Sequence, residues 1–116
     1  MIDLSKLSII IPFKYDTPER KENFSSIIQY FNTHTYNTHI IVMESGTAAQ
    51  LNEYKENPMI EYEFQKTDGP IHRTKQINDG AKKTNRPFIA CYDTDIILHP
   101  DSFSAALAIL DKHAHI

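Results

Sequence analysis

The sequence predicts an α/β fold, with a mainly parallel sheet covered by helices on both faces. Two observations lead to this class. Apolar runs rich in β-branched residues are typical of buried strands, and the segments between these runs carry helix signals. The runs occupy residues 7–13, 38–43 and 60–64 and the stretch that begins at Arg86. Strands that alternate with helices are joined by right-handed crossovers and therefore run parallel. A chain of 116 residues has room for one such domain, residues 1–116.

The first strand and the helix after it have clear boundaries. Residues 7–13 form an apolar run whose end is marked by Pro12, which cannot donate a hydrogen bond to a strand ladder. Thr17, Pro18 and Glu19 then mark a helix start, with a hydroxyl N-cap, proline at the first helical position and an acid in the first turn. The helix is expected to reach about Asn32. Four residues at helical spacing form its apolar stripe: Phe24, Ile27, Ile28 and Phe31.

The second and third strands differ in character. Residues 38–43 are apolar and lead into Glu44, so this acid ends a buried strand. Residues 60–64 alternate apolar and acidic side chains, which predicts an exposed edge strand. Between them we expect a short helix with three apolar residues facing inward: Ala48, Ala49 and Leu51.

A polar helix, from about His72 to Lys83, is expected to precede the fourth strand. That strand follows Arg86 and reads as buried on both faces, with Cys91 as a small core residue. Beyond it, the sequence from His99 predicts a last helix, whose apolar residues could form a surface for self-association. The apolar residues proposed for that surface are Phe103, Leu107 and Ile109.

Strand order determines where a ligand can bind. If the first three strands wind in one direction and the fourth lies on the other side of the first, the order is 3-2-1-4, which is the order we expect. Ligands of open α/β sheets bind beyond the carboxyl ends of the strands, where the order reverses. The ends of the strands would bring three groups of residues to that crevice: Pro12 and Phe13, Glu44, and Asp93 and Asp95.

The Asp93-x-Asp95 pair is the strongest candidate for chemistry in the sequence. Two carboxylates one residue apart repel each other unless a cation lies between them. A hard divalent cation such as Mg²⁺ or Mn²⁺, with a diphosphate attached, satisfies this requirement. The alternative is that both aspartates are turn residues that cap the next helix, because turns favour Asp for its local hydrogen bonds.

Charge and cysteine content exclude several classes of partner and compartment. Twelve basic and 15 acidic residues give a net charge of −3, so nucleic acid and anionic membranes are not expected partners. The apolar run at residues 7–13 is too short to cross a bilayer. Cys91 is the only cysteine, which excludes an internal disulfide and suits a reducing compartment. We therefore expect a cytoplasmic protein.

Several motifs, in the same order along the chain, resemble those of the nucleotide-sugar-binding half of GT-A glycosyltransferases. The closest likeness is to the galactosyltransferase type and to family 2 enzymes of polysaccharide biosynthesis. The resemblance covers nearly the whole chain. Its motifs are Ile9-Ile10-Ile11-Pro12-Phe13, Val42-Met43-Glu44, His72-Arg73-Thr74-Lys75-x-x-Asn78-x-Gly80 and Phe88-x-x-x-x-Asp93-x-Asp95-Ile96-x-x-x-Pro100.

The resemblance implies a UDP-sugar donor, a saccharide acceptor and Mn²⁺ or Mg²⁺ as the cofactor. Pro12 and Phe13 would border the uridine, and Glu44 would bind its base or ribose. Structural roles are the alternatives for two of these residues, Phe13 as core and Glu44 as a turn acid.

The diphosphate side of the donor site would be formed by three residues. Arg73 would lie against the diphosphate or donor sugar, Asp93 would contact ribose or sugar, and Asp95 would be the direct metal ligand. The alternative for Arg73 is a solvated helix residue. His72 and His99 are assigned no role.

Members of this family continue into an acceptor-binding half that supplies the catalytic base. No residue before Ile116 has an evident claim to that role. We therefore expect a truncated product, a fragment, or a subunit completed by another chain, such as a second copy. We also expect no sugar transfer from this chain alone.

Two other functions fit parts of the pattern. A strand that ends in Asp-x-Asp also resembles the phosphatases of the haloacid dehalogenase type, but Ile97 stands where those enzymes carry Thr or Val. A non-catalytic module that binds nucleotide sugars is the other alternative.

Overall fold

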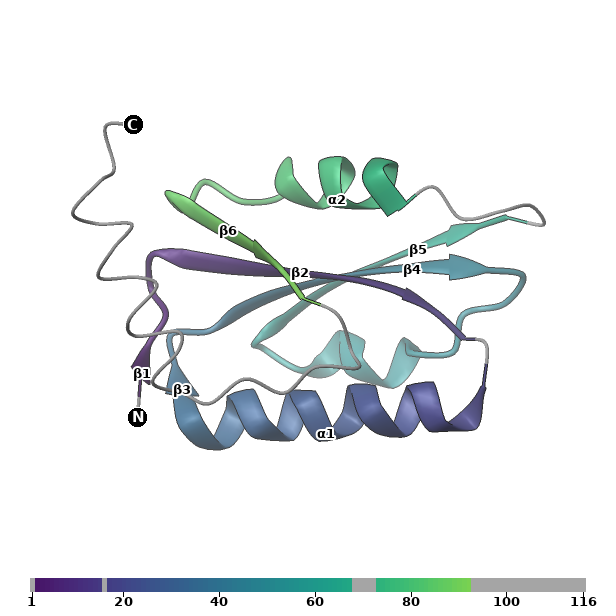
Figure 1. The fold of residues 1–116 in the computed structure, drawn as a ribbon, viewed down its shortest axis with the longest axis horizontal. Coiled ribbons are helices and arrows are strands. Elements are labelled where there is room, and N and C mark those ends of the chain that lie inside the picture. Colours follow the sequence, from purple (N-terminus) through teal and green to yellow (C-terminus); the bar gives the residue numbers. More distant parts are fainter. Residues whose placement is uncertain (1, 16, 68–72, 93–116) are drawn as a thin grey trace.

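The computed structural model describes residues 2–15, 17–67 and 73–92. In this part of the chain, a four-stranded parallel sheet has the order β5-β4-β2-β6 (Figure 1). The four strands are the predicted ones, so the α/β class and the order 3-2-1-4 are confirmed. Their bounds are Leu7–Lys14 for β2, His39–Gly46 for β4, Ile60–Lys66 for β5 and Phe88–Cys91 for β6.

Two α-helices lie on opposite faces of this sheet, as predicted (Figure 1). The helix α1, Pro18–His34, begins at the expected cap, where the Thr17 hydroxyl accepts a hydrogen bond from the Arg20 amide at 3.3 Å. The helix α2, Arg73–Ala81, is shorter than the predicted polar helix. None of the helices in the described ranges is long and apolar enough to cross a bilayer.

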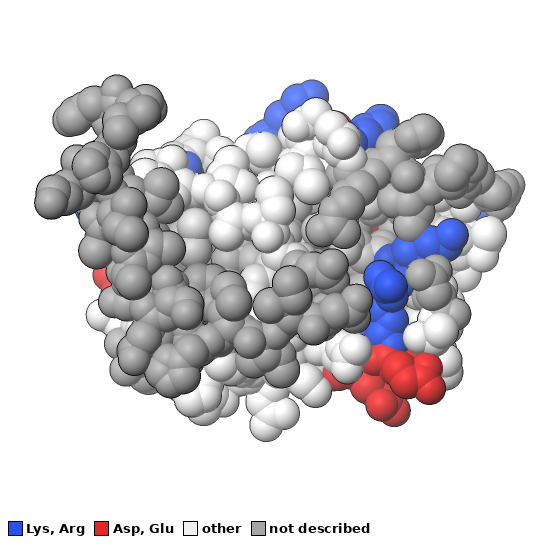
Figure 2. Space-filling model, in the orientation of Figure 1, with Lys and Arg blue, Asp and Glu red and all other residues white. Residues whose placement is uncertain are grey.

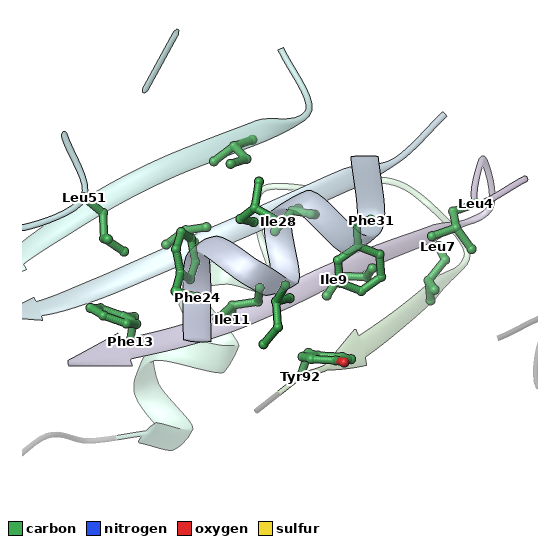
Figure 3. Packing of buried hydrophobic residues seen from close by; sticks show 14 residues of the cluster. Leu4, Leu7, Ile9, Ile11, Phe13, Phe24, Ile28, Phe31, Leu51 and Tyr92 are labelled. Atoms are coloured by element: carbon green, nitrogen blue, oxygen red, sulfur yellow. The ribbon is translucent and has the colours of Figure 1, made fainter. Parts of the chain in front are cut away.

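The larger core lies between the sheet and α1. Figure 3 shows the phenylalanines of α1 directed toward the apolar side chains of β2. The rings of Phe13 and Phe24 meet edge to face at 5.4 Å between centroids, and those of Phe31 and Tyr92 at 5.5 Å. The predicted apolar stripe of α1 is buried throughout. Full burial of each of these large side chains contributes about 1.5–3 kcal/mol to stability.

The core on the other face is smaller. Ile10, Ile41 and Met43 are buried there beneath α2. Gly80 lets the helix approach closely, because a Cβ at this position would lie 3.1 Å from Cγ2 of Ile10 and 3.3 Å from Cγ of Met43. This close approach is a physical reason for glycine at the end of the Asn78-x-Gly80 motif.

A partly buried polar cluster lies at the amino ends of the strands. The Ser8 hydroxyl is hydrogen-bonded to Nδ1 of His39 at 2.8 Å and to the Thr84 hydroxyl at 2.6 Å. Burial lowers the pKa of His39, and the neighbouring Arg86 lowers it further, whereas Glu61, 4.0 Å from Nε2, opposes the shift. The neutral imidazole is therefore favoured at this position.

The prediction that β6 is buried on both faces is wrong. Cys91 is exposed, so it is not a core residue, and Ile89 is 44% exposed. Both side chains lie on the face covered by α2, but α2 packs on β2 and β4 and leaves β6 uncovered. As the last strand on its side of the described sheet, β6 resembles an edge strand.

The segment after β4 also differs from the prediction. In place of a helix at Ala48, the chain continues irregularly until a 3₁₀ helix, η1, at Asn52–Glu56. Leu51 is fully buried as expected, but Ala48 is exposed. A second small parallel sheet, which the sequence did not predict, pairs β1 (Ile2–Asp3) with β3 (Thr35–Tyr36).

Several predictions lie outside the described residues. They concern Asp93 and Asp95, the turn before α2, the last helix from His99 and its proposed surface for self-association.

Candidate functional site

The candidate site is a pocket at the carboxyl ends of β2, β4 and β5. Its volume is about 200 Å³. The carboxyl edge is the side of an open α/β sheet where ligands bind. The lining is mainly polar and mixes one cation with hydroxyl, amide and aromatic groups. It includes Lys14, Tyr15, Ser45, Thr47, Gln50 and Thr67.

Ser45 is fixed in this pocket from the α2 side. Nε2 of Gln76 donates hydrogen bonds to the Ser45 hydroxyl at 2.6 Å and to the Met43 carbonyl at 3.0 Å. Gln76 is 3% exposed, so these bonds are shielded from water. The helix α2 is thereby tied to the carboxyl end of β4.

Glu44 is fixed from the opposite face. It is 1% exposed, and its carboxylate accepts hydrogen bonds from the backbone amides of Gln50 and Leu51. The Tyr62 hydroxyl of β5 donates a further hydrogen bond to the same carboxylate. Burial, and then this hydrogen bond, raise the pKa of the Tyr62 hydroxyl far above its usual range. Tyr62 therefore acts as a donor at any physiological pH.

The structure brings some of the predicted site residues together. Phe13 and Glu44 are register partners on β2 and β4, and Pro12 pairs with Met43. Phe13 is 1% exposed and packs in the core, so its position favours the structural alternative over a contact with uridine. The hydrogen bonds that Glu44 accepts likewise favour its structural alternative, in which it is a turn acid. Pro12 is half-buried in β2.

Of the residues predicted to contact diphosphate and metal, Arg73 lies in the described part of the chain, whereas Asp93 and Asp95 lie outside it. Arg73 is the first residue of α2. Asp93 follows Tyr92, whose amide donates to the Ile10 carbonyl at 2.9 Å beyond the end of β6. Within residues 2–15, 17–67 and 73–92, no group of three or more His, Cys, Asp or Glu side chains could hold a metal ion. The metal assignment to Asp93 and Asp95 thus stays a prediction from sequence.

Sequence reasoning missed the residues that shape the pocket. Gln76 lies in a polar helix, and its residue type gives no sign of its buried role. Its spacing gave one usable signal, because Gln76 lies four residues before Gly80 and therefore on the same side of α2. For Gln50 and Tyr62 the local sequence contains no comparable signal, since no periodic pattern relates them to Glu44, which lies six residues before Gln50 and 18 before Tyr62.

Comparisons with protein-family models, curated proteins and solved structures found no match to this chain. The functional argument therefore rests on the site and on the motifs.

Proposed function

We propose that the chain binds a nucleoside-diphosphate sugar at the carboxyl edge of its sheet, as the donor-binding half of a GT-A glycosyltransferase. The observation that carries this proposal is the polar pocket at the carboxyl ends of β2, β4 and β5, strands to which β6 also runs parallel. The strand order reverses between β2 and β6, and such a reversal is a typical ligand site. In the sequence, the Asp93-x-Asp95 pair directly follows Tyr92.

The residues that line the pocket suit the base and ribose, the uncharged part of a nucleotide-sugar donor. Gln50, Ser45 and Thr47 offer the neutral donors and acceptors that a base and a ribose require. Tyr15 is 37% exposed and lines the pocket, so its ring is available to a nucleobase. We therefore assign to Tyr15 the aromatic contact that the motif suggested for Phe13.

The charged part of the donor is assigned to the residues that the motifs suggest. Arg73 would bind the diphosphate, Asp93 would contact ribose or sugar, and Asp95 would hold Mn²⁺ or Mg²⁺. The bound metal would supply Lewis-acid neutralisation of the diphosphate. The reaction would be hexosyl transfer to a saccharide acceptor in polysaccharide biosynthesis. On the face that Figure 2 displays, the visible Lys and Arg side chains of the described residues form separate groups.

Isothermal titration of UDP tests the proposal. Binding should be tighter with Mn²⁺ than with a chelator, because two carboxylates repel a bare diphosphate and attract a metal-bound one. Asp95→Asn should remove this metal dependence, with a loss of at least about tenfold in affinity in Mn²⁺. Asp3→Asn, at the amino edge of the fold, is the matched control and should leave the titration unchanged. Equal binding in Mn²⁺ and in chelator would contradict the proposal.

A second titration separates the diphosphate from the nucleoside. Arg73→Ala should weaken the binding of UDP and leave that of uridine nearly unchanged, because uridine lacks the phosphates that Arg73 would contact. Hydrolysis of p-nitrophenyl phosphate with Mg²⁺ would instead favour the phosphatase alternative. UDP-sugar binding with no transfer in the presence of an acceptor-binding partner would favour the binding module.

A further inference from the structure

We infer that Glu44 is a positioning residue, which holds one wall of the pocket in place and does not itself contact the ligand. This inference rests on the proposed function, because it concerns the same pocket. It departs from the role that the motif implied for Glu44, a direct contact with base or ribose.

The Glu44 carboxylate is hydrogen-bonded to the loop that follows β4. Its Oε2 accepts from the Gln50 amide at 2.9 Å, and its Oε1 accepts from the Leu51 amide at 3.2 Å. The residues between Glu44 and Gln50 include most of the pocket wall on this side, among them Thr47. A single buried side chain thus determines where this wall lies relative to the end of β4.

Tyr62 connects the same carboxylate to the neighbouring strand. Its hydroxyl donates to Oε1 of Glu44, and its ring lies beneath Nζ of Lys55 from η1, at 5.7 Å from the ring centroid. We call Glu44, Tyr62 and the amides of Gln50 and Leu51 the carboxylate latch. The latch joins β4, β5 and the loop between them.

The latch leaves no free side of the carboxylate for a ligand. Glu44 is 1% exposed, and both of its oxygens already accept hydrogen bonds. A direct contact with a nucleoside would require the loss of charge-assisted bonds to the amides or to Tyr62, which are stronger than bonds between neutral groups. The geometry therefore favours action through Gln50, whose side chain lines the pocket.

The inference predicts that the latch can be weakened without touching the pocket lining. Tyr62→Phe removes only the hydroxyl donor, and Glu44→Gln weakens the acceptor while keeping its size. Both variants should speed hydrogen exchange at the amides of Gln50 and Leu51 in the ligand-free protein. Both should also weaken UDP binding in Mn²⁺, by about tenfold for Glu44→Gln and less for Tyr62→Phe. Tyr36→Phe, an exposed tyrosine of β3, is the matched control and should change neither measurement.

The double variant tests whether Tyr62 and Glu44 act through the same loop, and the single variants distinguish positioning from direct contact. If both residues act through the same loop, the combined loss in affinity should be smaller than the product of the two single losses. Thermal unfolding of each variant verifies that the protein is folded. A Tyr62→Phe variant with faster exchange at Gln50 but unchanged UDP affinity would overturn the inference. So would a Glu44→Gln variant that loses affinity with unchanged exchange, since that result indicates a direct contact. Absence of UDP binding by the unmodified protein would instead overturn the proposed function, and the inference with it.

Discussion

The contact between α2 and the end of β4 gives the most precise stability prediction. Gln76 is buried, and its amide nitrogen bonds both the Met43 carbonyl and the Ser45 hydroxyl. Gln76→Leu keeps a similar volume but removes the donor. The change therefore tests the hydrogen bonds while the packing of the helix is largely kept.

The magnitude follows from the two bonds and their surroundings. Each bond contributes about 1 kcal/mol, and a buried acceptor left without a partner costs about 1–3 kcal/mol. The leucine side chain recovers part of this loss, because it buries more apolar surface next to Met43. We expect a net loss of about 2 kcal/mol in the free energy of unfolding, a substantial fraction of the total of about 5–15 kcal/mol typical of a domain.

Urea unfolding followed by circular dichroism measures this loss. The midpoint should fall with an unchanged slope, since the surface exposed on unfolding stays the same. Gln29→Leu, on the exposed side of α1, is the control and should shift stability by less than about 0.5 kcal/mol. Ser45→Ala combined with Gln76→Leu should cost less than the sum of the single changes. A Gln76→Leu variant as stable as the unmodified protein would refute the reasoning.

Three further predictions concern other parts of the fold. Gly80→Ala should lower stability by about 1 kcal/mol in urea unfolding, because crowding against Ile10 outweighs the higher helix propensity of alanine; a more stable variant would contradict the close contact. Phe31→Ala should cost about 3–5 kcal/mol, seen as a large fall in the thermal midpoint, because the ring is fully buried. The lowered pKa of His39 means that the unfolded chain takes up the proton first as pH falls below about 6.5, so stability decreases there. Urea titrations across pH should show a smaller decrease in stability for His39→Gln. If the pH dependence of stability were the same in this variant as in the unmodified protein, the assignment of the decrease to His39 would be contradicted.

The elements that sequence reasoning located correctly have strong local signals. These signals come from residues close together in the sequence: the apolar stripe and cap of α1 and the β-branched runs of β2 and β4. Crossover rules predicted parallel strands, whereas the order 3-2-1-4 depended on an assumed direction of winding, which the structure confirms. These features were therefore accessible without coordinates.

The features that were missed depend on contacts between distant residues. Glu44 was correctly placed at the end of a strand, but no local pattern indicates that Tyr62 would donate to it. The exposure of Cys91 depends on how far α2 extends across the sheet, which periodicity does not determine. The two-residue strands β1 and β3 are too short for any period to be recognised.

Paramagnetic broadening by Mn²⁺ tests the central claim most directly. Backbone amide signals are recorded with UDP and either Mn²⁺ or diamagnetic Mg²⁺. If Asp95 holds the metal, broadening should be strongest at Asp95 and its neighbours in the chain, should decrease along β6 from Cys91 toward Phe88, and should disappear in Asp95→Asn. Broadening centred on His39 at the amino edge, or broadening that persists in Asp95→Asn, would contradict a metal–diphosphate site at the carboxyl edge.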